Sequence, residues 1–268
     1  PTDTSAPSPT VSAAGQMSLL LEPESSPPWH RFTRGALAGN FLHDQLEWLA
    51  VEHFVLDEGT PNAERLRRRC ERAGRTEQAD EVVQWLSRVT QTPLGGVGAS
   101  LRSLGHVLPE MEFWLPAGRL QATEVDALCR AHLLSGLDRP GLPERELHGM
   151  LMGFADLVFE HDGRYWVLDY KSNHLGPDGQ AYHARALAEA MAEHRYDVQA
   201  ALYLLALHRL LRHRLGEAYL PETHLGGAVY LFLRGIDGPQ LGSHVVPPSL
   251  ALLEALDAML DARQEPST

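Results

Sequence analysis

The spacing of apolar residues predicts helices along much of the chain. Leu42, Leu46 and Leu49 recur at i, i+4 and i+7, the spacing of one helix face, and Asn40 is placed to cap that helix. His43 lies on an adjacent strip of the same helix. The same periodicity predicts helices over 62–75, 77–89, 124–134 and 181–215, and a last helix that Ser249 caps and that ends near Leu260.

A second, alternating pattern predicts a strand over 110–115. Side chains of a strand point to opposite faces in turn. Glu110 and Glu112 therefore fall on one face of this strand, and Met111 and Phe113 fall on the other. The polar face would be open to solvent or to a ligand, and the apolar face would pack on the core.

Two further strands form the clearest hairpin in the sequence. Residues 154–159 and 165–170 are joined by a short polar loop in which Asp162-Gly163 supplies the turn. The apolar run 228–233 is typical of a buried central strand. Together these elements predict an α/β fold, with a small mixed β-sheet flanked by helices and an additional helical N-terminal portion.

Two regions of the chain differ in composition. Residues 1–28 contain six prolines, six serines and three threonines and show little periodicity, which is typical of a flexible linker. We expect the folded domain to occupy residues 29–268. The first residue is Pro1 rather than methionine, so we expect the chain to be a fragment or a processed product.

Composition excludes several classes of protein. A chain of 268 residues, 44% hydrophobic and 22% charged, can bury a sizeable core. No apolar stretch approaches the roughly 18 residues of a transmembrane helix, and no secretory leader is recognisable, so we expect no membrane association. Cys70 and Cys129 are too few for a disulfide framework or a zinc site. A reducing cytoplasm is therefore the expected location.

The charge balance of 23 basic and 35 acidic residues gives a net charge of −12. This argues against a protein that coats nucleic acid by bulk electrostatics. It does not exclude DNA as a substrate, because a metal-dependent nuclease concentrates carboxylates where the phosphate is cut. Lys171 is the only lysine beside 22 arginines, so this position is a candidate for a compact ammonium that a guanidinium cannot imitate. Without another lysine there is no phosphate-binding loop ending in Gly-Lys-Ser or Gly-Lys-Thr, and hence no P-loop motor.

The hairpin carries the residues with the most distinctive chemistry. Asp169 and Lys171 lie two residues apart on one strand, so both side chains leave the same face about 6–7 Å apart. The turn brings Asp156 near Asp169. An exposed cross-strand ion pair explains such a trio about as well as a site does. In the second case the carboxylates hold a divalent cation, and the lysine acts on a water molecule or on the charge of a phosphoryl transition state. Without the ion, the pKa values of the carboxyl groups should be raised by their mutual repulsion.

The residues around these three groups resemble a known family. Gly153-Phe154-Ala155-Asp156, the hairpin and Asp169-Tyr170-Lys171 are similar to the D…DxK signature of the PD-(D/E)XK nuclease superfamily, and in particular to the nuclease domains of its RecB branch. Ala155 replaces the proline of the nominal signature. The resemblance covers roughly residues 29–262. Other blocks resemble further motifs of the family, namely Gly39-Asn40-Phe41-Leu42-His43, Glu110-Met111-Glu112-Phe113, His194-Arg195-Tyr196-Asp197-Val198-Gln199 followed by Tyr203, and Tyr230-Leu231-Phe232-Leu233-Arg234-Gly235.

The resemblance implies a metal site. Asp156 and Asp169 would hold Mg²⁺, with His43 completing the set of ligands and Tyr170 counted among them, and Ca²⁺ or Mn²⁺ could occupy the same position. Lys171 would act on the attacking water or on the transition state. The fold implied is the restriction-endonuclease-like core of the superfamily.

Other matching residues have supporting roles. Glu110 corresponds to the family's acid on the preceding strand, although Glu112 shares its face and stays an alternative. Gln199 and Tyr203 lie one helical turn apart and would support the lysine, a water molecule or the DNA backbone. Arg195 and Tyr196 are candidates for contacts with a phosphate and a base, or are ordinary surface residues of a helix.

The function implied is Mg²⁺-dependent hydrolysis of DNA, chiefly of single strands that a linked helicase produces. Its partners would be the helicase portion of a longer chain and RecC-like and RecD-like subunits. Its roles would be the processing of double-strand breaks and the degradation of foreign DNA. Two alternatives stay open. One is a non-catalytic member of the fold that binds DNA ends or acts as a scaffold, and the other is a stand-alone exonuclease of the superfamily.

Overall fold

The computed structural model describes residues 26–118 and 120–261. The helices within these residues are α1 Pro28–Arg31, α2 Ala36–Val51, α3 Pro61–Arg72, α4 Ala79–Gln91, α5 Ala122–His132, α6 Ala184–Glu193, α7 Tyr196–Leu215, α8 Pro221–His224 and α9 Leu250–Asp261. The strands are β1 His106–Pro116, β2 Leu120–Gln121, β3 Glu146–Leu147, β4 Met150–His161, β5 Arg164–Lys171, β6 Leu225–Phe232 and β7 Ser243–Val246. None of these helices is long and apolar enough to span a lipid bilayer.

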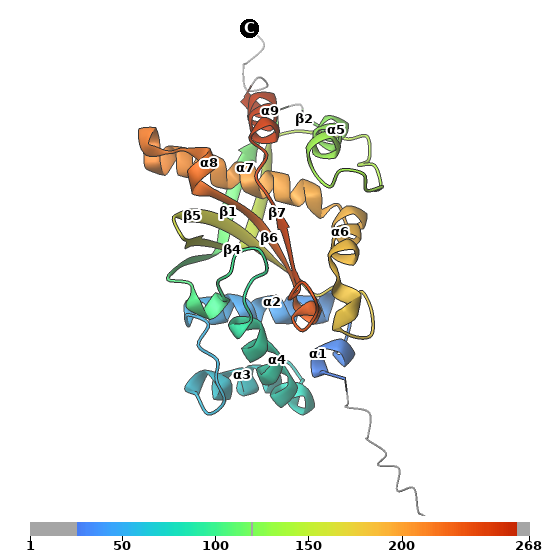
Figure 1. Ribbon diagram of the computed structural model, residues 1–268, viewed down its shortest axis with the longest axis vertical. Helices are drawn as coiled ribbons and strands as arrows, with labels where there is room; N and C mark the ends of the chain where they lie inside the picture. Colours follow the sequence, from blue (N-terminus) through green and yellow to red (C-terminus); the bar gives the residue numbers. More distant parts are fainter. Residues whose placement is uncertain (1–25, 119, 262–268) are drawn as a thin grey trace, which may run out of the picture.

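A mixed sheet forms the centre of the molecule (Figure 1). Its strands pair in the order β1-β4-β5-β6-β7, and every pair is antiparallel except β5 with β6. Parallel neighbours need a long connection, and here it contains α6 and α7. This confirms the expected α/β class with a small mixed sheet between helices.

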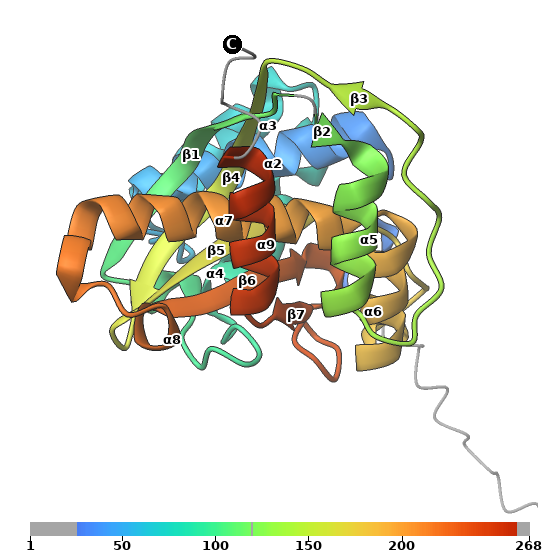
Figure 2. The same cartoon turned by 90° about the horizontal axis from the view of Figure 1, so that it is seen from above.

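The sheet separates two hydrophobic cores. Helices α1 to α4 pack on one face and bury residues such as Leu46, Leu66 and Trp85 with Leu168. Helices α5, α6, α7 and α9 cover the other face, as Figure 2 shows from above. The expected helical N-terminal portion is therefore one layer of the domain and not a separate unit.

Strands β1 and β4 exchange faces partway along their length. Leu157 belongs to the core beside α2, whereas Ala155, two residues away, belongs to the core beside α7. A regular strand keeps residues i and i+2 on one face, so the alternation is reset between them. On β1 the reset coincides with Glu110, whose φ of 46° is left-handed. Glu110 therefore lies at the point where the two-stranded ribbon of β1 and β4 exchanges its faces.

Several local predictions are confirmed. Asp162 and Gly163 both have positive φ, as a type I′ hairpin turn requires, and β4 and β5 pair across them. The Ser249 hydroxyl accepts a hydrogen bond from the N–H of Leu252 and caps α9. Of the predicted 1–28 linker, residues 1–25 lie outside the described residues, and Pro28 already belongs to α1.

The prediction that Asn40 caps the first long helix is wrong. Helix α2 begins at Ala36, after Gly35, and Asn40 is an exposed residue within it. Gly39 interrupts the helical pattern, since glycine disfavours helix interiors by about 1 kcal/mol relative to alanine. A Cβ atom at this position would lie 2.9 Å from the Ser172 hydroxyl oxygen, so the Ser172 side chain would have to rotate.

The single helix predicted over 181–215 is two helices. A left-handed residue, Arg195, separates α6 from α7 with φ of 56°. No glycine or proline marks this break in the sequence. Its cause is a set of ion pairs made by the Arg195 side chain, which is described with the site below.

The close packing of β6 against Trp166 gives a test of the fold. A Cβ atom at Gly226 would lie 2.2 Å from the indole of Trp166, whereas one at Gly105 would meet nothing within 4 Å. We expect Gly226→Ala to lower the free energy of unfolding by about 1–3 kcal/mol because the indole must move, and Gly105→Ala to change it by less than about 1 kcal/mol. Urea denaturation measures both, and equal values for the two variants would contradict this packing.

Candidate active site

The site forms where β4 and β5 stop pairing. Their paired register ends at Leu157 and Leu168, so Asp156 and Asp169 are not paired with each other, although Asp169 stays paired with Tyr230 of β6. The Asp156 carboxylate takes over the lost pairing, because its Oδ2 accepts a hydrogen bond of 2.7 Å from the N–H of Tyr170. The two carboxylates are thus held side by side at the end of the hairpin.

Asp169 is a buried carboxylate with three polar neighbours. Its side chain is only 4% exposed. Oδ1 accepts hydrogen bonds from the Gln199 amide at 3.0 Å and from the Tyr203 hydroxyl at 3.1 Å. The Lys171 ammonium lies 2.5 Å from Oδ2 as an ion pair, although no hydrogen bond of regular geometry reaches that oxygen within the described residues.

Lys171 is held on several sides. Its Nζ donates to Gln199 Oε1 at 3.1 Å and lies 3.9 Å from the ring centre of Tyr196 and 5.4 Å from that of Tyr230. A cation over the face of an aromatic ring is attracted by the ring's negative face. Gln199 therefore bridges the two residues, because its amide oxygen accepts from Lys171 and its amide nitrogen donates to Asp169. The rings of Tyr196 and Tyr230 hold the ammonium in place by cation–π contacts.

Tyr203 ties the supporting helix to the strand. Its hydroxyl lies 2.6 Å from the carbonyl oxygen of Phe154 and accepts from the Gln199 amide at 2.7 Å. Phe113 packs edge-on against its ring at 5.7 Å between centroids. The predicted pair, Gln199 and Tyr203, is therefore brought to Asp169 and Lys171.

His43 approaches the carboxylates from α2. Its Nδ1 is 3.3 Å from Asp156 Oδ2, and its ring meets that of Tyr170 edge-on. Burial lowers the pKa of His43, but the hydrogen bond to Asp156 and the charges of Asp156 and Asp169 outweigh burial, so the pKa is raised. The imidazole is therefore attracted to Asp156, which it contacts, and at longer range to Asp169.

A small cavity lies between α2 and the strands. Its lining includes His43 and Asp156 together with Glu47 and Glu110, but Glu112 is not among the lining residues. Burial and the charge of Glu110 raise the pKa of Glu47. Of the two candidate acids on β1, the structure thus brings Glu110 to the site.

Burial and repulsion act together on the central carboxylate. The pKa of Asp169 is raised to about 6, first by burial and then by the Asp156 charge, while Lys171 opposes the rise. For Asp169 the expected rise in pKa is confirmed, with removal from water as the larger cause and repulsion by Asp156 as the smaller. Groups shifted in this way occur most often at functional sites.

The donor atoms fit a hard divalent cation. The imidazole of His43 contacts Asp156, and Asp169 Oδ2 is a buried oxygen with no hydrogen bond from any residue that the structure describes. Mg²⁺ and Mn²⁺ prefer carboxylate oxygens as ligands, and Mn²⁺ also binds imidazole nitrogen. Within the described residues, however, no three His, Cys, Asp or Glu side chains stand close enough together to hold an ion. His43 and Lys171 instead contact the carboxylates directly.

The Tyr170 side chain points into the core. Its hydroxyl is buried and has no hydrogen-bond partner among residues 26–118 and 120–261, and burial raises its pKa well above the usual value. The phenol therefore stays protonated and is unsuited to bind an ion. A ligand from this residue would have to be its main-chain carbonyl.

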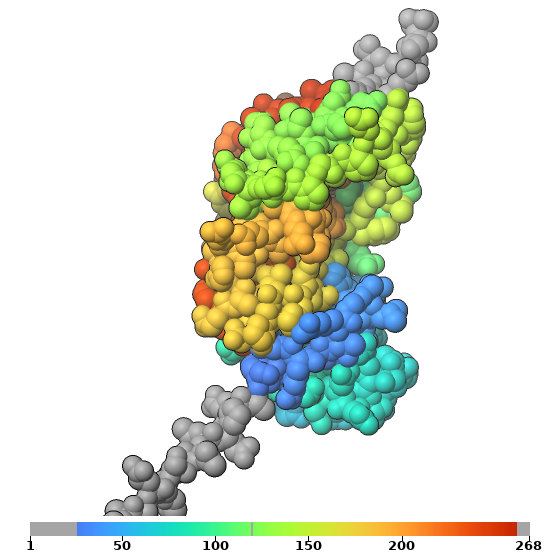
Figure 3. All heavy atoms as spheres, turned by 90° about the vertical axis from the view of Figure 1, so that its right-hand side faces the viewer, coloured from blue at the N-terminus to red at the C-terminus, as the bar shows by residue number. Residues whose placement is uncertain are grey.

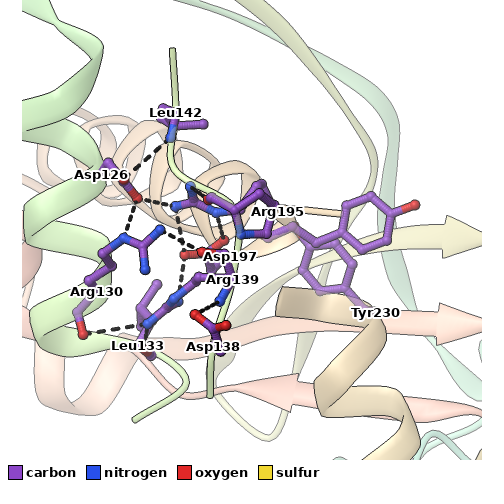
Figure 4. A network of polar contacts seen from close by, with 11 residues as sticks. Asp126, Arg130, Leu133, Asp138, Arg139, Leu142, Arg195, Asp197 and Tyr230 are labelled. Carbon is purple, nitrogen blue, oxygen red and sulfur yellow. Dashed lines mark hydrogen bonds and ion pairs between the residues drawn. The ribbon is translucent and has the colours of Figure 1, made fainter. Parts of the chain in front are cut away.

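A network of ion pairs fixes the start of α7, as Figure 4 shows. Arg139 and Asp197 form a buried pair at 2.6 Å, with side chains 2% and 0% exposed. Arg195 bonds to both Asp197 and Asp126, and Asp126 also accepts from Arg130. The network connects α5 and the loop after it to the first turn of α7, from which Tyr196 and Gln199 reach Lys171.

Two expectations for this region are corrected by these contacts. Arg195 is only 10% exposed and is used in ion pairs, so it does not present its guanidinium to a phosphate. Tyr196 places its ring against Lys171 and stacks on Tyr230, so it is not offered to a base. Sequence reasoning missed the roles of Tyr196, Tyr230 and Arg139. The tyrosines at least lay inside blocks with family resemblance.

The buried pair provides a test. Removing one partner of a buried ion pair leaves an uncompensated charge and costs about 3–5 kcal/mol. We expect a loss of up to this size for Arg139→Met, because Asp197 would keep only Arg195 as its ion-pair partner. The matched control is Arg185→Met, because the pair of Arg185 with Glu189 is exposed and such pairs contribute about 0–1 kcal/mol. Urea unfolding followed by circular dichroism measures both, and a loss below about 1 kcal/mol for Arg139→Met would refute the anchoring role.

Comparisons with known proteins agree with the geometry. The sequence profile of the PD-(D/E)XK nuclease superfamily matches residues 20–264. The chain is 44% identical over 255 residues to the RecBCD enzyme subunit RecB of Escherichia coli, which covers 93% of this chain and 21% of that protein. It is 36% identical over 214 residues to RecB of Mycobacterium tuberculosis, covering 68% of this chain and 20% of the relative. The chain therefore spans about a fifth of the length of these curated relatives.

Proposed function

This chain belongs to the PD-(D/E)XK nuclease superfamily, and we propose that it hydrolyses DNA phosphodiester bonds at the site built on Asp156, Asp169 and Lys171. The observation that carries the proposal is the arrangement of Asp169. This carboxylate is buried, is ion-paired to the only lysine of the chain and is bonded to Gln199 and Tyr203, so a charge that is costly to bury is kept at the end of a strand. An exposed surface ion pair would need none of this support.

The proposed metal ligands are Asp156, Asp169 and His43, with the main-chain carbonyl of Tyr170. Mg²⁺ bound there would supply positive charge to the phosphate and lower the pKa of a bound water. Asp156 is kept in place by the N–H of Tyr170, and Asp169 by Gln199 and Tyr203. We include Glu110 as a supporting acid on the same cavity.

Lys171 is proposed to act on the reacting phosphate or water. Its three donors can satisfy Gln199, Asp169 and one oxygen of the substrate at the same time. The aromatic rings of Tyr196 and Tyr230 limit its movement, so the charge is oriented before the reaction. Preorganised charge of this kind stabilises the negative charge that develops during phosphoryl transfer.

The wider assignment is also a proposal. The relatives are named as a subunit of the RecBCD enzyme. We propose that this domain acts with a helicase portion of a longer chain and with RecC-like and RecD-like subunits, cutting the unwound single strands during break processing and degradation of foreign DNA. With chromosomal and invading DNA as substrates, its place of action would be the cytoplasm.

Cleavage of labelled single-stranded DNA with Mg²⁺ tests the proposal. We expect Asp169→Asn and Lys171→Gln each to lower kcat by at least about 10²-fold, because each removes a contact made in the transition state. Asp162→Asn is the matched control, since Asp162 is an exposed turn residue with positive φ that asparagine also tolerates. Its activity should equal that of the wild type.

Circular dichroism must show that all variants are folded. Undiminished cutting by either site variant would refute the assigned roles. A wild-type chain that binds DNA but cuts none with Mg²⁺ or Mn²⁺ would instead favour the non-catalytic, DNA-end-binding alternative.

A further inference from the structure

Large apolar side chains are exposed on one face of the β1–β4 ribbon, directly beside the site. Phe154 is 44% exposed, Met152 and Trp114 are each 54% exposed, and Met150 is 51% exposed. Trp114 pairs with Met152, and Phe154 follows Met152 along β4 at the next position of the same face. We call Trp114, Met152 and Phe154 the apolar wall. Contiguous exposed apolar groups of this kind mark interaction sites.

The apolar wall faces the same side of the sheet as α2. Its strand neighbours Gly153 and Ala155 face the opposite side, because Phe113 packs on Gly153 and Ala155 belongs to the core beside α7. Alternation then directs Phe154 and Met152 toward the side from which His43 reaches the carboxylates. Figure 3 shows the outline of the molecule indented between α2 (blue) and the yellow-green segment that leads into β4.

Phe154 is coupled to the reaction centre. It lies two residues before Asp156, a separation of about 7 Å along a strand. Its carbonyl oxygen is 2.6 Å from the Tyr203 hydroxyl, which also contacts Asp169. A group bound on this ring is thus held a fixed, short distance from the carboxylates.

Arg34 supplies a positive charge beside the segment that follows β5. Arg34, directly before α2, contacts His174 at 2.8 Å, and His174 lies three residues after Lys171. In the part of the chain that the structure describes, the Arg34 guanidinium forms no ion pair with a carboxylate. Glu112, the cross-strand partner of Phe154, makes the apolar wall itself unfavourable for a phosphate. Phosphates are therefore favoured at Arg34 and bases at the wall.

We infer that the apolar wall stacks the unpaired bases of the DNA strand being cut, while Arg34 and His174 bind its backbone. The inference rests on the proposed function and adds a reason for a single-strand preference, because the faces of bases inside a duplex are covered by their neighbours. Every base offers a π-face, so such a surface works on any sequence.

Binding of two probes tests the inference. Labelled oligothymidylate and an abasic strand of equal length carry the same phosphates, but only the first has bases. In EDTA, which prevents cutting, we expect the wild-type chain to bind oligothymidylate at least about tenfold more tightly, since stacking contributes about 1–3 kcal/mol per base. Fluorescence anisotropy measures both dissociation constants.

Variants then separate stacking from charge. Trp114→Leu and Phe154→Leu keep an apolar surface but remove the ring, so each should reduce the ratio of the two affinities by about fivefold or more. Arg34→Gln should weaken both probes by the same factor and reduce the salt dependence of binding. The matched control is Leu220→Ala, an exposed apolar residue preceding α8, which should change neither.

The outcomes distinguish this inference from the proposed function. Equal binding of the two probes by the wild type, or an unchanged ratio in both leucine variants, would overturn stacking and leave the wall as a face for a protein partner. In that case cutting by the wild type would still support the nuclease. A wild type that binds neither probe and cuts no DNA would refute both.

In cleavage assays we expect the leucine variants to raise KM about tenfold with kcat changed less than about twofold.

Discussion

The structure depends on keeping one carboxylate charged inside the protein. Asp169 lies at the end of a central strand, where water has little access, and an unpaired charge there would cost several kcal/mol. The cost is offset from three directions, by the Lys171 ammonium, the Gln199 amide and the Tyr203 hydroxyl. Each partner comes from β5 or α7, so the position of α7 on the sheet is coupled to the charge state of the site. Burial still raises the pKa of Asp169 to about 6. The ionised form of this carboxylate would therefore be stabilised further by a bound cation.

Contacts from other parts of the fold hold the start of α7 in position beside the site. Arg195 breaks the helical path in a left-handed conformation, and its ion pairs with Asp126 and Asp197 stabilise that break. Arg139 closes the network from the loop after α5. On the other face, α2 passes close to Ser172 because Gly39 has no side chain, which brings His43 to Asp156. Two helices far apart in the sequence thus approach the hairpin from opposite sides of one sheet.

The sequence was most informative where the structure is local. The hairpin, its Asp162-Gly163 turn and the convergence of Asp156, Asp169 and Lys171 follow from alternation and turn chemistry, and the blocks around them led to the family. The reversal of the β1–β4 ribbon at Glu110 and the break at Arg195 left no signal, because both are non-glycine residues at positive φ, and the ion pairs of Arg195 are made with residues that meet only in the folded chain. The tyrosines beneath Lys171 were also hidden, since Tyr196 and Tyr230 come from elements that meet only in the folded chain. Local rules can place a side chain on a face, but the contacts between distant elements decide what that face meets.

The central claim is that His43, Asp156 and Asp169 surround one divalent ion. A crystal structure of the chain with Mn²⁺, in which anomalous scattering locates the metal, tests this most directly. The account predicts a single peak within about 2.0–2.6 Å of an oxygen of each carboxylate and of a ring nitrogen of the imidazole. Reaching it requires small movements, because His43 and Lys171 now contact the two acids. A peak at another place, or none between these side chains at saturating Mn²⁺, would contradict the account.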